Sequence, residues 1–418
     1  MKYDFDKLTD RFNQNSLKWD VQKNELPMWV ADMDFEVAPE IVNALRERLD
    51  KKVFGYNIIP NEWNKAYVNH WKNKHGYEMK EDELLFSTGV VPTISSLVRK
   101  LTTPGENVLI QTPVYNIFFN SIVNNGRNVL ESPLIYKDGK YEINYTDLEE
   151  KLSLGQTTMM ILCNPHNPIG KIWSKDELAK IGNLCHKYNV IVLSDEIHCD
   201  ITDPDKNYIP FQSVNEECRD ISVMAMAPTK CFNIAGLQTS AICVPNKFLR
   251  HKVWRAINTD EIAEPNTFAI QAAIAAFNNG EEWLSEMRQY VYENKQIVSK
   301  YLKDNIKEVY LVPSEATYLL WIDCSKITEN TLDLCDFIRK ETGLYVSDGV
   351  QYGKTGANFI RLNIACPKER LLDGLNRFKI GIEKYIELKK NWYRSSISRL
   401  DINLFIINQG CQNQVRNQ

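Results

Sequence analysis

Five short apolar runs between residues 107 and 244 are the feature that most limits how this chain can fold. The runs are NVLIQ (107–111), TMMILC (158–163), VIVLSD (190–195), DISVMAM (220–226) and SAICV (240–244). Uninterrupted runs of this length are typical of strands buried on both faces, as in a parallel sheet. Between the second and third runs, residues 174–189 have an apolar helical period, and Ser174 and Glu177 have the spacing of a capping box. This order predicts an open α/β sheet with right-handed crossovers.

The remaining sequence predicts a second, smaller α/β unit. The segments 264–280 and 281–305 are predicted to be consecutive helices, and the second is long enough to bridge two domains. Strands are then predicted at 317–324 and 358–365, and helices at 331–343 and 367–390. With 418 residues, two domains are expected. We expect an N-terminal arm at 1–47 that contributes to the smaller domain, a large domain at 48–287, the smaller domain at 288–390, and a polar extension at 391–418.

Charge and cysteine usage exclude several classes of protein. The chain has 50 basic and 54 acidic residues, with a net charge of −4, so neither a nucleic-acid footprint nor a polybasic membrane patch is expected. The first residues, MKYDFDKLTDRF, lack the apolar region of a secretory signal, and no uncharged apolar stretch is long enough to span a membrane. The ten cysteines are scattered singly, as is typical of reduced core thiols. We therefore expect a cytoplasmic protein.

Chemically useful residues follow the predicted strands directly. Ligands bind at the carboxyl ends of the strands in such sheets, and these ends carry TPVYN (112–116), NPHNPIG (164–170), DEIHCD (195–200) and APTK (227–230). Partial burial makes a lysine such as Lys230 nucleophilic, and a carboxylate such as Asp195 can pair with a pyridinium nitrogen. An isolated lysine or acid at a strand end is more often a solvated charge or a helix cap. Together, in this order, the residues indicate a site for pyridoxal 5'-phosphate.

Eight motifs spread over about residues 1–390 make the chain similar to a known superfamily. They are MWVADMDF (28–35), FGY (54–56), STGVVP (87–92), TPVYNIF (112–118), NPHNPIG (164–170), SDEIHCD (194–200), APTKCFNIAGLQ (227–238) and FIRLNIA (359–365). The chain resembles the fold-type I, aspartate-aminotransferase-like pyridoxal-phosphate enzymes, and within them the cystathionine β-lyase, or cysteine-S-conjugate β-lyase, branch. The resemblance implies an α/β large domain with a mostly parallel sheet, the PLP-dependent transferase-like fold, together with a smaller α/β domain.

The resemblance implies a role for each residue around the cofactor ring. Lys230 would bind the cofactor covalently and then move a proton at the substrate's Cα. Asp195 would keep the pyridine nitrogen protonated, and Asn167 would donate to the ring's 3′-oxygen. His198 occupies the position where many transaminases have a tyrosine that donates to the same oxygen. Tyr115 would stack on the ring face.

The phosphate of the cofactor is expected at the start of a helix. The resemblance places it against the backbone N–H groups of Gly89 and Val90, where a helix N-terminus favours an anion. Thr88 would lie nearby, and Tyr56 would reach in from a partner subunit, so the resemblance also implies a homodimer.

Two departures from the superfamily concern the same phosphate. Many members have a serine three residues before the lysine and a basic residue eight residues after it, both in contact with the phosphate. This chain has Ala227 and Gln238 at those positions. Phosphate contacts must then depend more on Thr229, the helix N-terminus and Tyr56.

The substrate's α-carboxylate is expected at the last predicted strand. Alternation in NFIRLNIA places the apolar residues on one face and Arg361 with Asn363 on the other, so the guanidinium should point away from that strand's core. The resemblance implies that Arg361 clamps the carboxylate with a bidentate fork. Asn167 and the backbone around Ala31 would contact the same carboxylate.

The reaction implied by the resemblance is β-elimination of an amino-acid thioether, such as cystathionine or another L-cysteine S-conjugate, to a thiol, pyruvate and ammonia. An aminotransferase of the same fold is an alternative, because it shares the first steps. A regulatory role through protein binding is an alternative of another class, since members of this branch also act as partners of transcription regulators. Neither HExxH nor paired Cys/His spacing is present, so no metal is expected. The absence of GxGxxG excludes a dinucleotide site.

Overall fold

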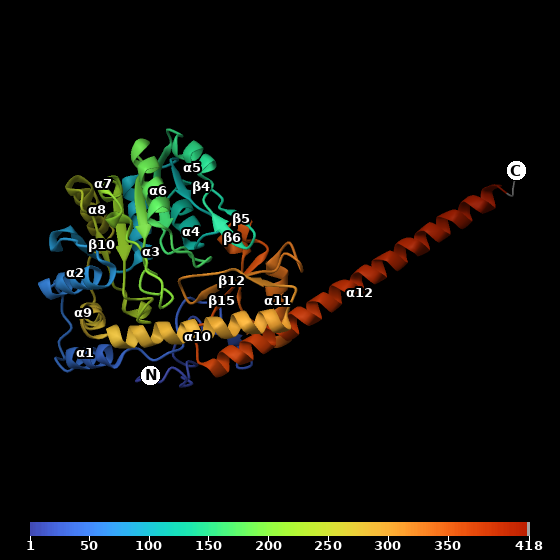
Figure 1. Cartoon of the computed structure of the whole chain (residues 1–418), viewed down its shortest axis with the longest axis horizontal. Helices are drawn as coiled ribbons and strands as arrows, with labels where there is room; N and C mark the ends of the chain where they lie inside the picture. Colours follow the sequence, from blue (N-terminus) through green and yellow to red (C-terminus); the bar gives the residue numbers. More distant parts are fainter. Residues whose placement is uncertain (416–418) are drawn as a thin grey trace.

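A seven-stranded sheet forms the centre of the larger part of the molecule (Figure 1). The computed structural model describes the backbone of residues 1–415 and the side chains of residues 1–391. The strand order is β2-β10-β9-β8-β7-β3-β4. The strands are β2 (Leu84–Ser87), β3 (Asn107–Ile110), β4 (Asn128–Glu131), β7 (Thr157–Cys163), β8 (Ile191–Asp195), β9 (Ser222–Met226) and β10 (Ser240–Cys243). The five predicted runs are all strands of this sheet.

The sheet is mostly parallel, as predicted, with one exception. Strand β10 runs antiparallel to both of its neighbours, β2 and β9, whereas the other pairs are parallel. Extending the parallel interpretation to the fifth run is therefore wrong. The run SAICV is fully buried even though its strand is antiparallel, so an uninterrupted apolar run reports burial on both faces and not strand direction.

Helices cover both faces of the sheet, and alternate residues of each strand face the two layers. On one face, Met159 and Ile161 of β7 belong to a core that includes α3 (Val90–Leu101), α4 (Ile117–Val123) and α8 (Lys247–Thr259). On the other face, Met160 and Leu162 pack with α5 (Tyr145–Leu152), α6 (Lys175–Lys187) and α7 (Glu216–Asp220). Helix α6 begins with the predicted capping box, in which Ser174 Oγ accepts from the Glu177 N–H. The result is a three-layer α/β/α arrangement.

The smaller unit is built on a four-stranded antiparallel sheet of order β11-β12-β15-β14. Its strands are β11 (Tyr310–Leu311), β12 (Leu319–Asp323), β14 (Ser347–Asp348) and β15 (Phe359–Asn363). Helices α11 (Thr331–Thr342) and α12 (Lys368–Val415) pack on each other beside it. The N-terminal segment joins this unit, because β1 (Leu26–Pro27) pairs in parallel with β13 (Leu344–Tyr345).

Four further α-helices and a small hairpin belong to the described fold. Helices α1 (Pro39–Leu49) and α2 (Asn61–His75) pack on α9 (Ala269–Asn279). The long helix α10 (Glu281–Asn305) runs beneath both units in Figure 1, as predicted for a connecting helix. Strands β5 (Ile135–Lys137) and β6 (Lys140–Glu142) form the hairpin. The domain limits at 47, 287 and 390 stay predictions.

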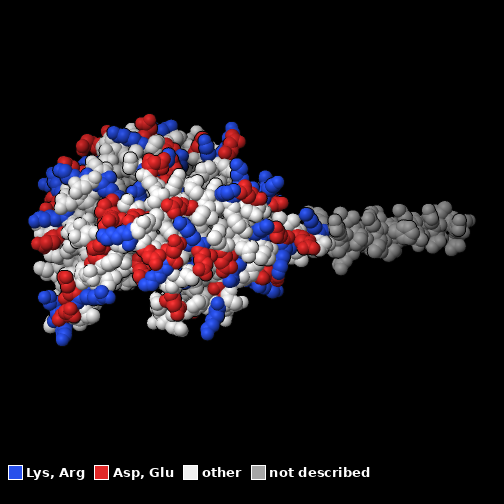
Figure 2. All heavy atoms as spheres, turned by 60° about the horizontal axis from the view of Figure 1, so that its bottom comes forward, with Lys and Arg blue, Asp and Glu red and all other residues white. Residues whose placement is uncertain are grey.

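Residues 391–415 of the predicted polar extension continue the last helix. The backbone of α12 remains helical through Val415 (Figure 1), and residues 416–418 lie outside the described part of the chain. On the face drawn in Figure 2, basic and acidic side chains are interspersed, in keeping with a net charge of −4. Within the described residues, no helix has both the length and the apolar composition needed to cross a bilayer.

Candidate active site

A cavity of about 310 Å³ lies where the sheet topology predicts a ligand, at the carboxyl ends of the central parallel strands. Most of the residues predicted from the sequence line it: Ala31, Thr88, Gly89, Val90, Tyr115, Asn167, Asp195, His198, Thr229 and Lys230. Two predicted residues do not line it. Arg361 lies behind Asn167, and Tyr56 is fully exposed outside the cavity of its own chain.

Strand register brings the key side chains together. Asp195 ends β8 and is paired with Cys163 of β7 on one side and with Ala225 of β9 on the other. Asn167 follows β7 by four residues, and Lys230 follows β9 by four residues. Because the three strands are parallel neighbours, the turns that leave them open into the same cavity. A buried His166 fixes the Asn167 turn, since its Nε2 donates to the carbonyl of Pro113 at 2.8 Å.

Lys230 is partly buried, and its Nζ donates to the carbonyl oxygen of Ala31 at 2.7 Å. Burial lowers the pKa of Lys230 to about 8, Asp32 and Asp195 oppose this lowering, and the charge of Arg361 adds to it. A substantial fraction of the amine is therefore neutral near physiological pH. This is the state in which a lysine attacks a carbonyl carbon or accepts a proton.

Asp195 lies at the bottom of the cavity with only 4% of its surface exposed. Its Oδ1 accepts from the N–H of Ile197 at 3.1 Å, and no ion pair to it is formed among the described residues. Burial raises the pKa of Asp195 to about 6, although the Ile197 N–H and the Lys230 charge act in the opposite direction. A cation bound beside this buried carboxylate would therefore stabilise its charged form.

His198 and Asn167 leave specific donors and acceptors free toward a ligand. The Nδ1 of His198 is buried without a partner among the described residues. Burial, together with the charges of Lys230 and Arg361, lowers the pKa of His198 to about 3, so the imidazole is neutral. The side-chain oxygen of Asn167 accepts from Arg361 Nη1 at 3.2 Å, so its NH₂ group is the part available to a ligand.

Arg361 leaves β15 on the side that the alternation predicts. Its Nη2 donates to the carbonyl of Trp29 at 3.0 Å, and its Nη1 reaches Asn167. The guanidinium lies over the ring of Tyr352, with its carbon 5.0 Å from the ring centroid. Its Nε is buried and has no partner among the described side chains. A buried guanidinium that has one N–H donor unused is suited to an anionic group such as a carboxylate.

The opposite end of the cavity is suited to a phosphate. Helix α3 begins at Val90, with Gly89 as its N-cap, so the unpaired N–H groups of its first turn are directed toward an incoming anion. Thr88 and Thr229 line the same end. Gln238, at the position where many members of the superfamily have a basic residue, also lines the cavity, and Ala227 is buried in the sheet core.

The structure adds residues that the sequence did not indicate. Tyr318 is fully buried, and its hydroxyl donates to the carbonyl of Ala31 at 3.0 Å, the same oxygen that Lys230 contacts. The apolar walls of the cavity include Cys163, which directly precedes the NPHNPIG motif, and Ile197, which lies within the DEIHCD motif. Proximity to those motifs was a usable signal for the two wall residues. Tyr318 had none, since its contact joins two segments that are 287 residues apart in the sequence.

These features fit a phosphorylated pyridine aldehyde. A helix N-terminus would bind the phosphate, and an unpaired buried carboxylate would face a protonated ring nitrogen. A neutral imidazole and a carboxamide NH₂ would lie beside a ring oxygen, and a lysine with a lowered pKa would lie within bonding reach of the aldehyde. Tyr115, whose pKa burial raises to about 12, stays un-ionised and supplies a flat apolar face.

The comparisons with known proteins agree with this chemistry. A family model described as aminotransferase class I and II matches residues 24–378. Cystathionine beta-lyase PatB of Bacillus subtilis is 40% identical over 385 residues, which are 90% of this chain and 99% of that protein. Cystalysin of Treponema denticola, solved with a pyridoxal 5'-phosphate cofactor, superimposes with a TM-score of 0.89 at 32% identity, covering 92% of this chain and all of that one. A pyridoxal-phosphate-bound C-S lyase of Staphylococcus hominis gives a TM-score of 0.85 at 34% identity, covering 91% and 98%. The chain belongs to the aminotransferase class I and II family.

Proposed function

We propose that the protein is a pyridoxal 5'-phosphate-dependent carbon–sulfur β-lyase that cleaves cystathionine or related L-cysteine S-conjugates. The observation that carries this proposal is one cavity in which Lys230, with a pKa lowered to about 8, faces the buried carboxylate of Asp195. The choice of a lyase over other reactions of the family is supported by relatives named cystathionine beta-lyase and C-S lyase, which match along nearly their whole length.

Each of these cavity residues contacts a different part of the cofactor. Lys230 binds the aldehyde carbon, and Asp195 pairs with the pyridine nitrogen. Asn167 and His198 contact the 3′-oxygen, and Tyr115 stacks on the ring. The N-terminus of α3, with Thr88, Gly89, Val90 and Thr229, binds the phosphate. When bound, the cofactor withdraws electrons from the substrate's α-carbon through its protonated ring.

A second copy of the chain completes the phosphate end. In the single chain, Val53, Phe54, Tyr56 and Ile58 are exposed, so a run of large apolar side chains is left in water beside helix α2. Adjacent exposed side chains of this kind mark an interaction surface. We place Tyr56 of each chain at the phosphate of the other, in a homodimer. The nine cysteines of the described residues are all free and buried, which supports a location in the reducing cytoplasm.

The chain's own groups then act on the substrate in sequence. Arg361 and Asn167 hold the α-carboxylate, which orients the Cα–H bond toward Lys230. The amine of Lys230 takes the Cα proton, and the carbonyl of Ala31 holds the resulting ammonium. The bond between Cβ and sulfur breaks with its electron pair leaving on sulfur, which takes up a proton as the thiol departs. Water converts the remaining three-carbon fragment into pyruvate and ammonia.

Incubation with L-cystathionine tests this proposal directly. We expect equal amounts of pyruvate and free thiol without any keto-acid acceptor, and no product from Lys230→Ala. Turnover that requires a keto acid and releases no thiol would instead identify an aminotransferase. A protein that acts only through a regulatory partner would keep its biological effect in Lys230→Ala, so the same variant separates that role from catalysis.

A further inference from the structure

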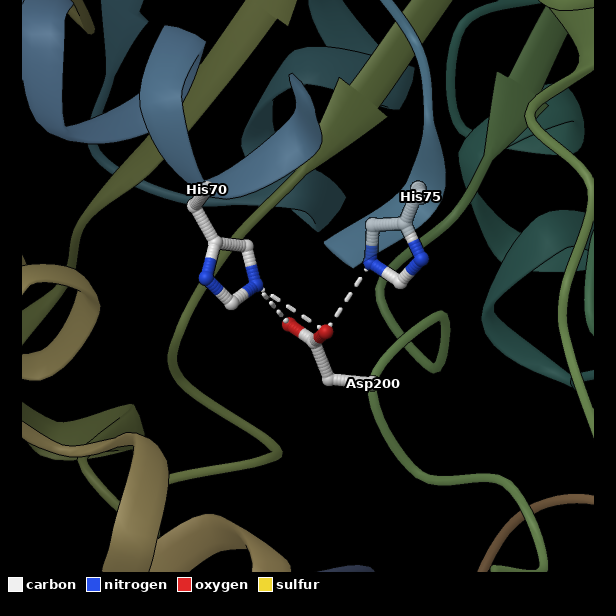
Figure 3. Close-up of side chains that lie close together, drawn as sticks. All are labelled: His70, His75 and Asp200. Carbon is white, nitrogen blue, oxygen red and sulfur yellow. Dashed lines mark hydrogen bonds and ion pairs between the residues drawn. The ribbon is translucent and has the colours of Figure 1, made fainter. Parts of the chain in front are cut away.

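Two histidines and an aspartate converge at a point outside the cofactor cavity (Figure 3). His70 and His75 come from the C-terminal half of helix α2, and Asp200 comes from the segment that follows β8. The Nε2 of His70 lies 3.0 Å from both carboxylate oxygens, and the Nε2 of His75 lies 3.0 Å from Oδ1. All three side chains are at most 6% exposed. Three potential metal-ligand atoms therefore lie within 4.8 Å of one another in the protein interior.

We propose that His70, His75 and Asp200 form a structural zinc site, separate from the cofactor cavity. Two imidazole nitrogens and one carboxylate oxygen are donors that zinc commonly takes from proteins. Both imidazoles direct a ring nitrogen at the same carboxylate, so the donors already converge without any change of backbone.

The spacing of the donors is close to that of a tetrahedral site. Zinc bonds of about 2.0 to 2.1 Å to nitrogen and oxygen place two tetrahedral ligands about 3.3 Å apart. Both imidazole nitrogens lie 3.0 Å from Oδ1 of Asp200, so the ion needs each imidazole to move away from that oxygen by a few tenths of an ångström. Side-chain torsions alone supply movements of that size.

Cys231 is the nearest candidate for a fourth donor, but its Sγ does not lie within 4.8 Å of both histidine nitrogens, so its side chain must turn toward them to bind the ion. Its Sγ lies 3.6 Å from Asp200 Oδ2, whereas His75 contacts Oδ1 of the same carboxylate. In the metal-free arrangement the thiol donates to Asp200. On binding, zinc replaces that proton, which passes to solvent, while each imidazole binds through Nε2 and carries its proton on Nδ1. Two positive charges then meet one thiolate and one carboxylate, so the buried site is neutral overall, which avoids the cost of an unpaired buried charge.

The ion would connect helix α2 to two segments that line the catalytic cavity. Asp200 follows Asp195 by five residues and His198 by two, and Cys231 directly follows Lys230. The two histidines anchor α2, which begins just after the exposed run at 53–58. A closed four-ligand site here would fix the cofactor-binding segments to one another without touching the cofactor. It also revises the expectation of no metal drawn from the sequence, where only local Cys/His spacing was considered, because Asp200 lies 130 residues from His70.

Metal binding to the purified holoenzyme tests the site. After removal of metal with a chelator, the protein is titrated with Co²⁺, a spectroscopic substitute for zinc, and its zinc content after dialysis is measured by mass spectrometry. We expect one ion per chain and the intense visible bands of tetrahedral cobalt. His70→Gln and His75→Gln keep an N–H for Asp200 but remove the imidazole ligand, so each should weaken binding by more than about 100-fold, beyond the effect of losing an outer partner.

A surface imidazole provides the matched control. His186 is exposed on α6, and His186→Gln should bind cobalt like the wild type. A cobalt-to-sulfur band in the near ultraviolet that disappears in Cys231→Ser supports the fourth ligand, and its absence from the wild type overturns that assignment. Failure to bind one ion per chain, or equal binding by His75→Gln, overturns the site and leaves a hydrogen-bonded cluster. None of these readouts depends on lyase activity, so the result stands whatever the reaction proves to be.

Discussion

Replacing Asp195 by asparagine should stabilise the cofactor-free protein while removing the group that the cofactor requires. The carboxylate is 4% exposed and forms no ion pair among the described residues, and burial raises its pKa to about 6 from an ordinary 3.8. Its hydrogen bond from the Ile197 N–H, at 3.1 Å, can be kept by the asparagine carbonyl. Asp195→Asn therefore removes the buried charge and retains the contact.

The magnitude and its pH dependence follow from the same pKa. A folded-state pKa above the unfolded one means that protonation stabilises the fold: this contribution is complete below pH 3.8 and lost as the pH rises through about 6. A difference of about two pH units, at about 1.4 kcal/mol for each, corresponds to about 3 kcal/mol. Asparagine is neutral at every pH. The variant should exceed the wild type by about 3 kcal/mol at pH 8 and by about half of that at pH 5.

Urea unfolding of the cofactor-free proteins at pH 8 and pH 5 measures this difference. Asp205→Asn, at an exposed carboxylate, is the control and should change stability by less than about 0.5 kcal/mol. With pyridoxal 5'-phosphate present, the order should reverse, because tight binding stabilises only the wild type substantially. Equal stabilities of the two proteins at pH 8 would refute the reasoning that burial of the Asp195 charge destabilises the cofactor-free fold. A gain in stability of Asp195→Asn that is the same at both pH values would refute it as well.

The other expected results concern the cofactor lysine, the substrate clamp and the dimer. Binding of the cofactor to the cofactor-free protein should become faster as the pH rises through about 8, because only neutral Lys230 bonds to the aldehyde. Visible absorbance in a stopped-flow instrument measures this rate, and a rate that does not change with pH would contradict the prediction. Arg361→Lys should raise KM for L-cystathionine by about 10- to 100-fold with a smaller change in kcat, because lysine cannot make a bidentate contact with the substrate's carboxylate. Steady-state kinetics measure both constants, and an unchanged KM would show that Arg361 does not bind the carboxylate. Mixing inactive Lys230→Ala with inactive Tyr56→Ala should restore up to about a quarter of wild-type activity. About half of the dimers then contain one chain of each variant, and each mixed dimer has one intact site out of two. No recovery of activity would show that Tyr56 does not contribute to the partner's site.

The fold and most of the cavity could be predicted because they depend on local patterns. A strand end that carries Asp195 and another that carries Lys230 must meet once their strands are parallel neighbours, and both the apolar runs and the order of the chain supported that arrangement. The direction of β10 could not be predicted in this way, because its residues are equally buried in either direction. Strand direction depends on the connection between strands, and the apolar run carries no information about it.

Contacts between distant segments were the other limit. Tyr318 contacts Ala31 across 287 residues of the sequence, and Asp200 contacts His70 across 130 residues. Nothing in the local sequence of either pair indicates its partner, because each contact joins segments that are far apart along the chain and meet only in the folded structure. The residue types were visible from the start, but their convergence was not.

The N-terminal segment is, for this reason, part of the chemical machinery and not only an arm of the smaller unit. Asn363 of β15 donates to the carbonyls of Val30 and Asp32, at 2.6 and 2.7 Å, and so fixes the backbone that presents the Ala31 carbonyl to Lys230. The carboxylate of Asp32 also opposes the lowering of the Lys230 pKa that burial produces. The basicity of the catalytic amine is therefore set partly by the large unit, which buries it, and partly by the segment held on the smaller unit. Any movement of one unit relative to the other changes the pKa of that amine together with access to it.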